Sequence, residues 1–417
     1  MGERRVVVVG GGVIGTCCAY FLAKRGAHVT LLERDEIGQG ASFGNAGCIA
    51  PGHGPINKPG RLRQALESVF DDTSPLYIAP RFDPSLIKWL WAFARSCSEL
   101  HQRHSMQALA PLGHVSTALF DELVVDEAID CAYRREGYYD VFLTDSRFMA
   151  AQEEANLTQE HGYHPELLDG AGIREREPAF KDSVVGAVFY PEAASIDPHR
   201  FVTGLADRAE RSGVDLRTRA EVAEVTVRGQ AVTGVRLADG EVVEADAVVL
   251  ATGAYSPELY RRLGLDLPLQ PAKGYHRDRI PKPGETPALR TTCMLGERSV
   301  FCTPMDSFIR FAGTLEFSGV NHDIRRSRLE QLTRSASDYF EGVGEAESLS
   351  EWCGLRPCIS DGLPAVGPMP GYSGAFIATG HAMLGLTLGP VTGKLVSDYV
   401  IDGEPSLDIT SLSPDRF

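Results

Sequence analysis

The chain has 417 residues, of which 43% are hydrophobic and 23% charged, and its formal net charge is −15. This length exceeds one ordinary hydrophobic core and predicts about two or three domains or one composite fold. The strong negative charge argues against nucleic acid or an anionic membrane as a main partner. The nine cysteines are scattered without a C-x-x-C pair, so we expect no metal site and a reducing, cytosolic compartment.

The stretch that organises the chain begins with four valines at 6–9, which predict a buried parallel strand. Gly10, Gly12 and Gly15 follow as a G-x-G-x-x-G pattern. The first glycine allows a tight turn, the second lets a pyrophosphate approach the backbone, and the third lets the next helix lie close to the strand. We expect no cleavable signal, because cleavage would remove this loop.

A helix is predicted over residues 13–24, with Val13 and Ile14 in its first turn. The next strand, 29–32, leads into Glu33 and Arg34. A carboxylate at the end of this second strand can accept hydrogen bonds from a ribose diol. Strand, glycine loop, helix, strand and acid thus fall in the order of a dinucleotide site. The alternative is a tight strand-to-helix turn that binds no ligand.

A run of small residues follows at 38–48. Backbone of this kind can pass close to a flat or charged ligand. A mobile surface loop is the alternative interpretation. The run includes Ala41, Ser42, Ala46, Gly47 and Cys48.

Residues 85–107 carry apolar side chains at helical spacing and include tryptophans, and a further helix is predicted at 115–127. Such an amphipathic helix can lie on a membrane surface, although packing against the core is the commoner outcome. No stretch of about 18 apolar residues predicts a membrane-spanning helix. His101 and His104 form an H-x-x-H pattern without a third ligand, so a solvated helical face is expected there.

The middle of the chain alternates strand patterns with one clear helix at 198–211, which Asp197 is expected to cap. Residues 268–350 are expected to alternate strand and turn. The other strands expected are 137–143, 184–189, 214–216, a hairpin of 222–227 with 232–237, and a buried strand at 245–251 before Thr252 and Gly253.

Near the C-terminus, a strand at 376–379 leads into Gly380 and His381, and a helix is predicted from Gly385 to about residue 401. A helix N-terminus offers free N–H donors and the positive end of the helix dipole. A flavin ring that has gained electrons carries negative charge along one edge, which such a helix end stabilises. Leu384, Leu386 and Thr387 would lie at this end.

Together these pieces resemble the FAD-dependent D-amino-acid oxidase and glycine oxidase superfamily, and within it the bacterial D-amino-acid dehydrogenase branch. They span essentially the whole chain in the family's order. The motifs that carry the resemblance are the Gly10–Gly15 loop with Glu33, the run 41–47, residues 251–253, Gly354-Leu355-Arg356-Pro357 with Asp361-Gly362, and residues 379–381 with 385–387.

The resemblance implies an α/β fold, α+β overall, with a Rossmann-type FAD-binding domain built from separated segments. A mixed-sheet substrate domain would be formed by the segments between them. The implied segments are 1–78, 196–265 and 354–417 for the FAD-binding domain, and 79–195 and 266–353 for the substrate domain.

The resemblance also implies bound FAD without a covalent link, since the family's attachment positions do not fall on Cys48. Val222 would offer its backbone to the adenine. By position, the cofactor-binding residues would be Gly10, Gly12, Val13, Ile14, Gly15, Glu33, Arg34, Ala41, Ser42, Ala46, Gly47, Cys48, Val222, Thr252, Gly253, Gly380, His381, Leu384, Gly385, Leu386 and Thr387.

Three residues are candidates for the substrate side of the site. Arg356 stands where relatives use an arginine to bind the substrate carboxylate, and a guanidinium suits that role through its bidentate geometry; the alternative is a structural salt bridge. Tyr275 is a candidate second carboxylate donor or an ordinary buried tyrosine. His53 would touch the substrate or cap a loop.

The activity that the resemblance implies is dehydrogenation of D-amino acids, with cyclic ones such as D-proline or hydroxyproline included. Hydride would pass from Cα to flavin N5, and the imino acid would be hydrolysed to a 2-oxo acid. A quinone or another electron-transfer partner is expected as acceptor. The rival interpretations are a sarcosine- or glycine-type oxidase that uses oxygen, and a flavin-binding subunit of a larger complex. We expect a cytoplasmic protein with at most peripheral membrane contact.

Overall fold

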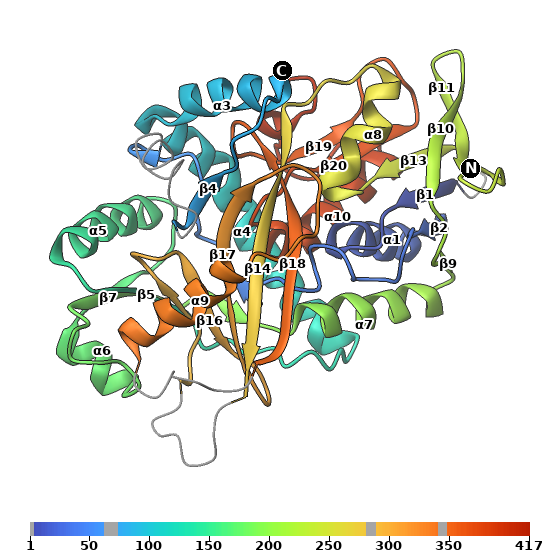
Figure 1. Cartoon of the computed structure of the whole chain (residues 1–417). Helices are drawn as coiled ribbons and strands as arrows, with labels where there is room; N and C mark the ends of the chain where they lie inside the picture. Colours follow the sequence, from blue (N-terminus) through green and yellow to red (C-terminus); the bar gives the residue numbers. More distant parts are fainter. Residues whose placement is uncertain (1–3, 62–73, 281–288, 341–347) are drawn as a thin grey trace.

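The structure is a computed structural model that describes residues 4–61, 74–280, 289–340 and 348–417. Its strands form two large sheets that lie side by side, with helices around them (Figure 1). This mixed α/β architecture confirms the predicted fold class. Besides the elements named below, the helices are α5 (Asp145–Gln159), α6 (Gly170–Arg176) and α8 (Ser256–Tyr260).

The first sheet is six-stranded and mostly parallel, and it gathers strands from three separated parts of the chain. The valines of β1 are buried at its centre, between β2 and β13, as the sequence predicts. Only the edge pair β19–β20 is antiparallel. The strand order is β19 (Ala365–Pro368), β20 (Ala375–Thr379), β13 (Ala247–Leu250), β1 (Arg5–Val9), β2 (His28–Leu32) and β9 (Asp215–Arg217).

Helices α1 (Val13–Lys24) and α10 (Gly385–Ile401) pack closely on each other against this sheet. Gly393 permits the contact, because a Cβ there would lie 2.7 Å from the Cys17 carbonyl oxygen. Cys17 and Cys18 are fully buried core residues. Two further helices border the same core: α7 (Pro198–Arg211), capped by Asp197 through the His199 and Arg200 N–H groups, and α4 (Glu99–Asp126).

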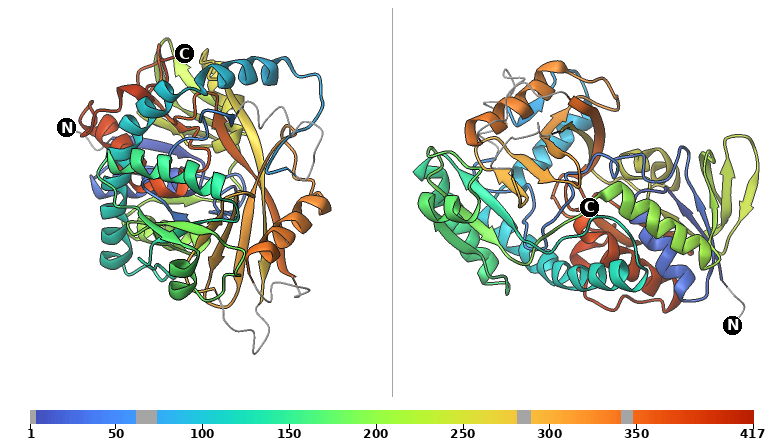
Figure 2. Two further views of the ribbon diagram at one scale, coloured as in Figure 1. Left: turned by 90° about the vertical axis from the view of Figure 1, so that its left-hand side faces the viewer. Right: turned by 90° about the horizontal axis from the view of Figure 1, so that it is seen from below.

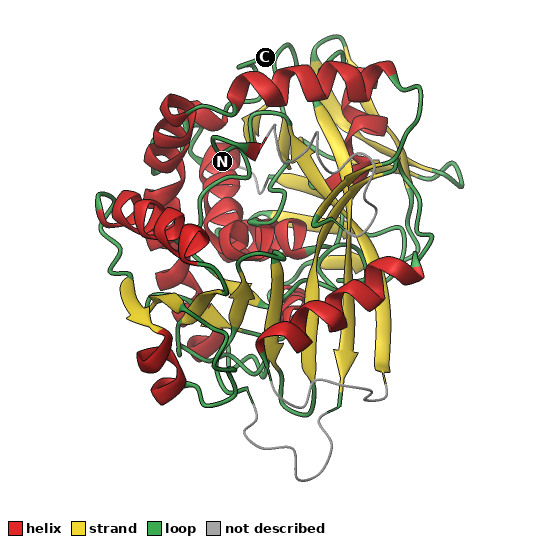
Figure 3. Cartoon of the chain, turned by 60° about the vertical axis from the view of Figure 1, so that its left-hand side comes forward, coloured by secondary structure: helices red, strands yellow, loops and turns green. Residues whose placement is uncertain are grey.

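The second sheet is nine-stranded and mixed, and its long strands β14 and β18 pair antiparallel. Helix α9 (Arg326–Tyr339) lies across one face of this sheet (Figure 3). The strand order is β18 (Ser348–Ile359), β14 (Leu269–Arg279), β17 (Ile309–Phe317), β16 (Val300–Pro304), β15 (Cys293–Leu295), β5 (Tyr138–Phe142), β7 (Gly186–Tyr190) and β6 (Glu166–Asp169), with β4 (Leu76–Ile78) beside β17.

A smaller sheet contains the predicted hairpin, β10 (Val222–Arg228) with β11 (Ala231–Leu237), together with β12 (Val242–Glu244). It projects from the body of the molecule in Figure 1 and in the right-hand view of Figure 2. A two-stranded pair of β3 (Cys48–Ile49) and β8 (Ala194–Ser195) lies near the junction of the large sheets.

The helix predicted over 85–107 is wrong as a single element. The structure has α3 (Pro84–Ser96) and then α4, because Ser98 accepts a hydrogen bond from the His101 N–H and starts a new helix. α3 buries Leu86 and Trp89 in the core, which is the commoner outcome weighed above, and it leaves Trp91 exposed.

Two expectations about residues 266–353 also change. Helix α9 interrupts the region expected to alternate strand and turn. Strand β18 runs from Ser348 to Ile359, and therefore crosses the domain boundary predicted after residue 353, while β4 places residues 76–78 in the nine-stranded sheet. The remaining domain boundaries stay predictions.

Within the described residues, α4 is the one helix long and apolar enough to cross a membrane by length and composition. Half of its most apolar 18-residue window is buried inside the protein. It packs against α10, and the Ser116 hydroxyl donates to the Thr387 carbonyl at 2.5 Å. The burial and these contacts describe a core helix.

Candidate active site

Two cavities meet at the junction of the large sheets, and Asn45 and Arg356 line both of them. The first, of about 210 Å³, follows the edge of the six-stranded sheet from Glu33 to the start of α10. The second, of about 530 Å³, lies between α10, α3 and the nine-stranded sheet.

The glycine loop forms one wall of the first cavity. Gly10 has φ +108°, and a Cβ there would lie 2.6 Å from the Ala251 carbonyl oxygen, so only glycine fits. A Cβ at Gly15 would overlap the Gly10 carbonyl, which explains the third glycine of the motif. Helix α1 starts on Gly12 without a side-chain cap of its own, and the Ser42 hydroxyl accepts from the Val13 N–H at 3.0 Å.

Glu33 and Arg34 lie at the far end of this cavity. The Glu33 carboxylate accepts hydrogen bonds from the Gly11 N–H at 2.6 Å and the Asp35 N–H at 2.9 Å. The Arg34 guanidinium lies over the ring of Tyr255, 3.7 Å from its centre. A carboxylate that accepts two backbone N–H groups keeps further lone pairs for a ligand.

The opposite end of the first cavity reaches the start of α10. Gly385 and Leu386 line it, and no side chain caps this helix end at Leu384. His381 lies beneath, its Nε2 3.0 Å from the Thr392 hydroxyl. Burial lowers the pKa of His381 to about 3, so the imidazole is neutral and leaves the helix end as the positive feature here.

The structure brings most predicted cofactor residues together. The first cavity is lined by Gly10, Gly12, Val13, Ile14, Glu33, Arg34, Ala41, Ser42, Val222, Thr252, Gly253, His381, Gly385 and Leu386. Ala46, Cys48, Leu384 and Thr387 instead line the second cavity, and Gly15, Gly47 and Gly380 line neither.

Arg356 reaches the point where the cavities meet. Its Nη1 donates to the Thr314 carbonyl at 2.7 Å. In the described part of the chain, no carboxylate forms an ion pair with it. Burial lowers its pKa from the usual value, as expected of a cation removed from water without an anionic partner. This environment does not match the alternative of a structural salt bridge.

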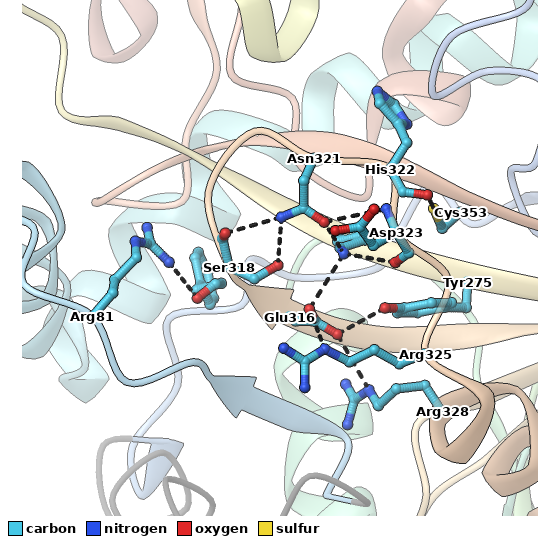
Figure 4. Close-up of polar contacts among 12 residues, drawn as sticks. Arg81, Tyr275, Glu316, Ser318, Asn321, His322, Asp323, Arg325, Arg328 and Cys353 are labelled. Atoms are coloured by element: carbon cyan, nitrogen blue, oxygen red, sulfur yellow. Dashed lines mark hydrogen bonds and ion pairs between the residues drawn. The ribbon is translucent and has the colours of Figure 1, made fainter.

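Tyr275 does not reach either cavity, and the expectation that it donates to the substrate does not fit the structure. Side chains alternate along β14, so Tyr275 faces α9 whereas its neighbour Gly274 faces the cavities. The hydroxyl donates to Glu316 at 2.8 Å inside a buried cluster (Figure 4).

His53 lines the second cavity, as do residues that the sequence analysis did not single out. Burial, reinforced by Lys58, lowers the pKa of His53 to about 4, so its imidazole is neutral. Lys58 pairs with Glu154, and Asp140 lies close by. The only sequence signal for Asp140 was a lone carboxylate inside an apolar strand pattern.

A buried ion pair holds the cavity wall in place. Arg310 makes two parallel hydrogen bonds of 2.9 Å to Asp278, and its Nη1 donates to the carbonyls of Phe43 and Asn45. The loop of small residues is thus fixed to the nine-stranded sheet. Trp352 lies over Gly44, where a Cβ would overlap its ring.

The chain matches the family described as FAD dependent oxidoreductase (DAO) over residues 5–399. It belongs to this family. The D-amino acid dehydrogenases of Methylobacterium nodulans and Xanthobacter autotrophicus are 35% and 33% identical to it over 418 residues, with 99% of each chain covered. The predicted resemblance is therefore confirmed, and the protein is an FAD-dependent oxidoreductase.

Among solved structures, the chain is similar to glycine oxidase from Geobacillus kaustophilus, with a TM-score of 0.79 and 25% identity over 100% of both chains. The similarity covers both large sheets and all of the segments that form the cavities. The DAO fold is therefore shared over the whole chain.

The first cavity fits the FAD of this family. It offers the N-terminal end of α1 at Gly12, the N-terminal end of α10 at Gly385, and a carboxylate at Glu33. Helix N-termini suit a pyrophosphate and an electron-rich ring edge, and the carboxylate suits a ribose diol.

We expect Glu33→Ala to weaken FAD binding about 10- to 100-fold, because a charge-assisted hydrogen bond contributes about 1.5–3 kcal/mol. Titration of the apoprotein with FAD measures the effect. Glu36→Ala is the matched control, since Glu36 is exposed and lines neither cavity. Equal affinities in the two variants would contradict the ribose assignment.

We also expect Asp140 to make the folding stability depend on pH, because burial raises the pKa of its carboxyl from 3.8 to about 8. Between these values the unfolded chain has lost the proton that the folded protein keeps, so stability falls as pH rises. The stability gain of Asp140→Asn over wild type should therefore grow from pH 4 to pH 8, by at least about 1.4 kcal/mol. Chemical denaturation at several pH values measures it, and a pH-independent difference would disprove the raised pKa.

Proposed function

We propose that this protein is a D-amino-acid dehydrogenase in which Arg356 binds the substrate carboxylate. The observation that carries the proposal is the place of Arg356, buried where the two cavities meet and without an acidic partner in the described residues. Relatives named D-amino acid dehydrogenase, similar over 99% of the chain, support the substrate class.

The residues of the first cavity would hold FAD without a covalent link. Cys48 lines the second cavity, and burial raises the pKa of its thiol, so it stays protonated and unreactive. When bound, FAD would supply the hydride-accepting chemistry. Arg356 would orient the substrate by its carboxylate so that Cα faces the first cavity.

The second cavity would hold the amino group and the side chain. The substrate amine must be neutral to lose hydride, and neutral His53 can accept a hydrogen bond from it without adding charge. The imine product then takes up water and yields a 2-oxo acid and ammonia, whereas a cyclic substrate yields a stable cyclic imine. The cavity of about 530 Å³ accommodates cyclic as well as open-chain substrates.

For the acceptor we propose a quinone or another electron carrier, which the dehydrogenase names of the relatives support. We propose a cytoplasmic protein that touches the membrane at most peripherally. The fold shared with glycine oxidase keeps an oxygen-using oxidase as the second candidate.

We expect D-amino acids, and not their L-enantiomers, to bleach the flavin absorption of the purified protein under anaerobic conditions. Bleaching by the chain alone excludes a subunit that needs partners for activity. Admission of air should then give little hydrogen peroxide. Rapid peroxide formation would establish the oxidase, and a flavin that no D-amino acid bleaches would overturn the proposed function.

Arg356→Lys should weaken the enzyme toward D-amino acids by about 2–5 kcal/mol in kcat/KM, because lysine keeps the charge but loses the fork. The FAD absorption and affinity should not change. The corresponding amines that lack a carboxylate are the control, since they should react poorly and equally with both proteins. A variant that loses FAD, or that impairs both substrates alike, would show that Arg356 is structural.

A further inference from the structure

Arg356 crosses a neighbouring strand to reach its position. It is on β18 opposite Ala272 of β14, whereas its hydrogen-bond acceptor, Thr314, is on β17 beyond β14. The Arg356 side chain therefore crosses β14 on the face that looks into the cavities. The residue it passes over is Gly274.

Gly274 leaves the space that this crossing needs. A Cβ built at residue 274 would overlap the guanidinium of Arg356. The backbone of Gly274 is ordinary extended strand without a positive φ, so its conformation does not demand glycine. Glycine weakens a strand interior, and here close approach of a side chain is the reason for it.

Thr314 supplies the acceptor through an irregularity in β17. Its φ is +64°, a left-handed conformation that a β-branched residue rarely adopts. The pairing of β14 with β17 shifts register at this point, between the Lys273 and Tyr275 pairs. The resulting bulge turns the Thr314 carbonyl toward Arg356 instead of leaving it in the ladder.

A buried ionic cluster holds the same point from the opposite face (Figure 4). Glu316 lies two residues beyond Thr314, and its carboxylate faces Lys273 at 3.4 Å and Arg325 at 3.2 Å. The Tyr275 hydroxyl donates to it at 2.8 Å. Since Lys273 and Tyr275 flank Gly274, the cluster ties β14 to β17 where Arg356 crosses.

We propose that Gly274 is a positioning residue for substrate binding. Because it has no side chain, the Arg356 side chain can pass over it and donate to the Thr314 carbonyl. In this position, the other N–H groups of the guanidinium face the substrate carboxylate. This inference rests on the role of Arg356 in the proposed function. It adds that the substrate affinity depends on the absence of a side chain at residue 274, on the strand that lies between the arginine and its acceptor.

The direct test is a crystal structure of Gly274→Ala, in which the Arg356 guanidinium should have left the Thr314 carbonyl. The apparent Kd for the D-amino acid, taken from the concentration dependence of anaerobic flavin bleaching, should rise about tenfold or more. The limiting bleaching rate and the FAD affinity should change much less. An unmoved guanidinium or an unchanged Kd would overturn the proposal.

Gly172→Ala is the control, because Gly172 lies on α6 and lines neither cavity, and the nearest atom to a Cβ there would be in the Asp169 carboxylate at 3.3 Å, a side-chain end that can shift. In an Arg356→Lys background the added alanine should cost less than in wild type, since both changes act through one side chain. Multiplicative effects in this double-mutant cycle would contradict the proposal.

Thr314→Gly is the second variant, and it does not depend on how well Gly274→Ala folds. Glycine adopts a positive φ freely, so the carbonyl should stay on Arg356 and the Kd should remain within about twofold of wild type. A tenfold loss would mean that the threonine side chain, and not the carbonyl, holds the arginine. If no D-amino acid bleached the flavin of the wild-type protein, the proposed function would be wrong. The crystal structure of Gly274→Ala tests the position of Arg356 independently of that function.

Discussion

The antiparallel pairing of β14 with β18 is the interaction on which both cavities depend. Its register places Gly274 opposite Gly354 and Ala272 opposite Arg356, all on the face that looks toward the six-stranded sheet. Because side chains alternate along a strand, a slip of one residue would turn Arg356 toward α9. After Ile359 the chain continues into β19 of the other sheet, so this strand pair connects the two large sheets.

Charge is distributed around this ladder according to its faces. On the face toward α9, the Glu316 carboxylate balances buried cations, and on the cavity face Asp278 satisfies Arg310. Arg356 differs from Arg310 in this respect, because in the described residues its hydrogen-bond partner is the Thr314 carbonyl and not a carboxylate. A buried cation without an anion is costly to fold, and this cost supports the proposal that Arg356 binds a carboxylate.

The cofactor side relies on backbone more than on side chains. Two helix starts, at Gly12 and Gly385, open into the first cavity, and the close contact of α1 with α10 holds them at a fixed distance. Glycine at residues 10 and 393 makes these approaches possible. The loop of small residues is held by Arg310, so the same ion pair serves the wall of both cavities.

The sequence by itself determined the features that depend on residues close together in the chain. The glycine loop, Glu33 and the start of α10 are local patterns, and residues of all three line the first cavity. The tertiary structure decided which face of β14 looks into the cavities. Tyr275 is on the other face and binds Glu316, whereas Gly274 is on the cavity face next to Arg356. It also brought Asp140 and Thr314 to the second cavity. Pairing between distant strands sets these positions, and neither register nor a bulge can be derived from the spacing within one strand.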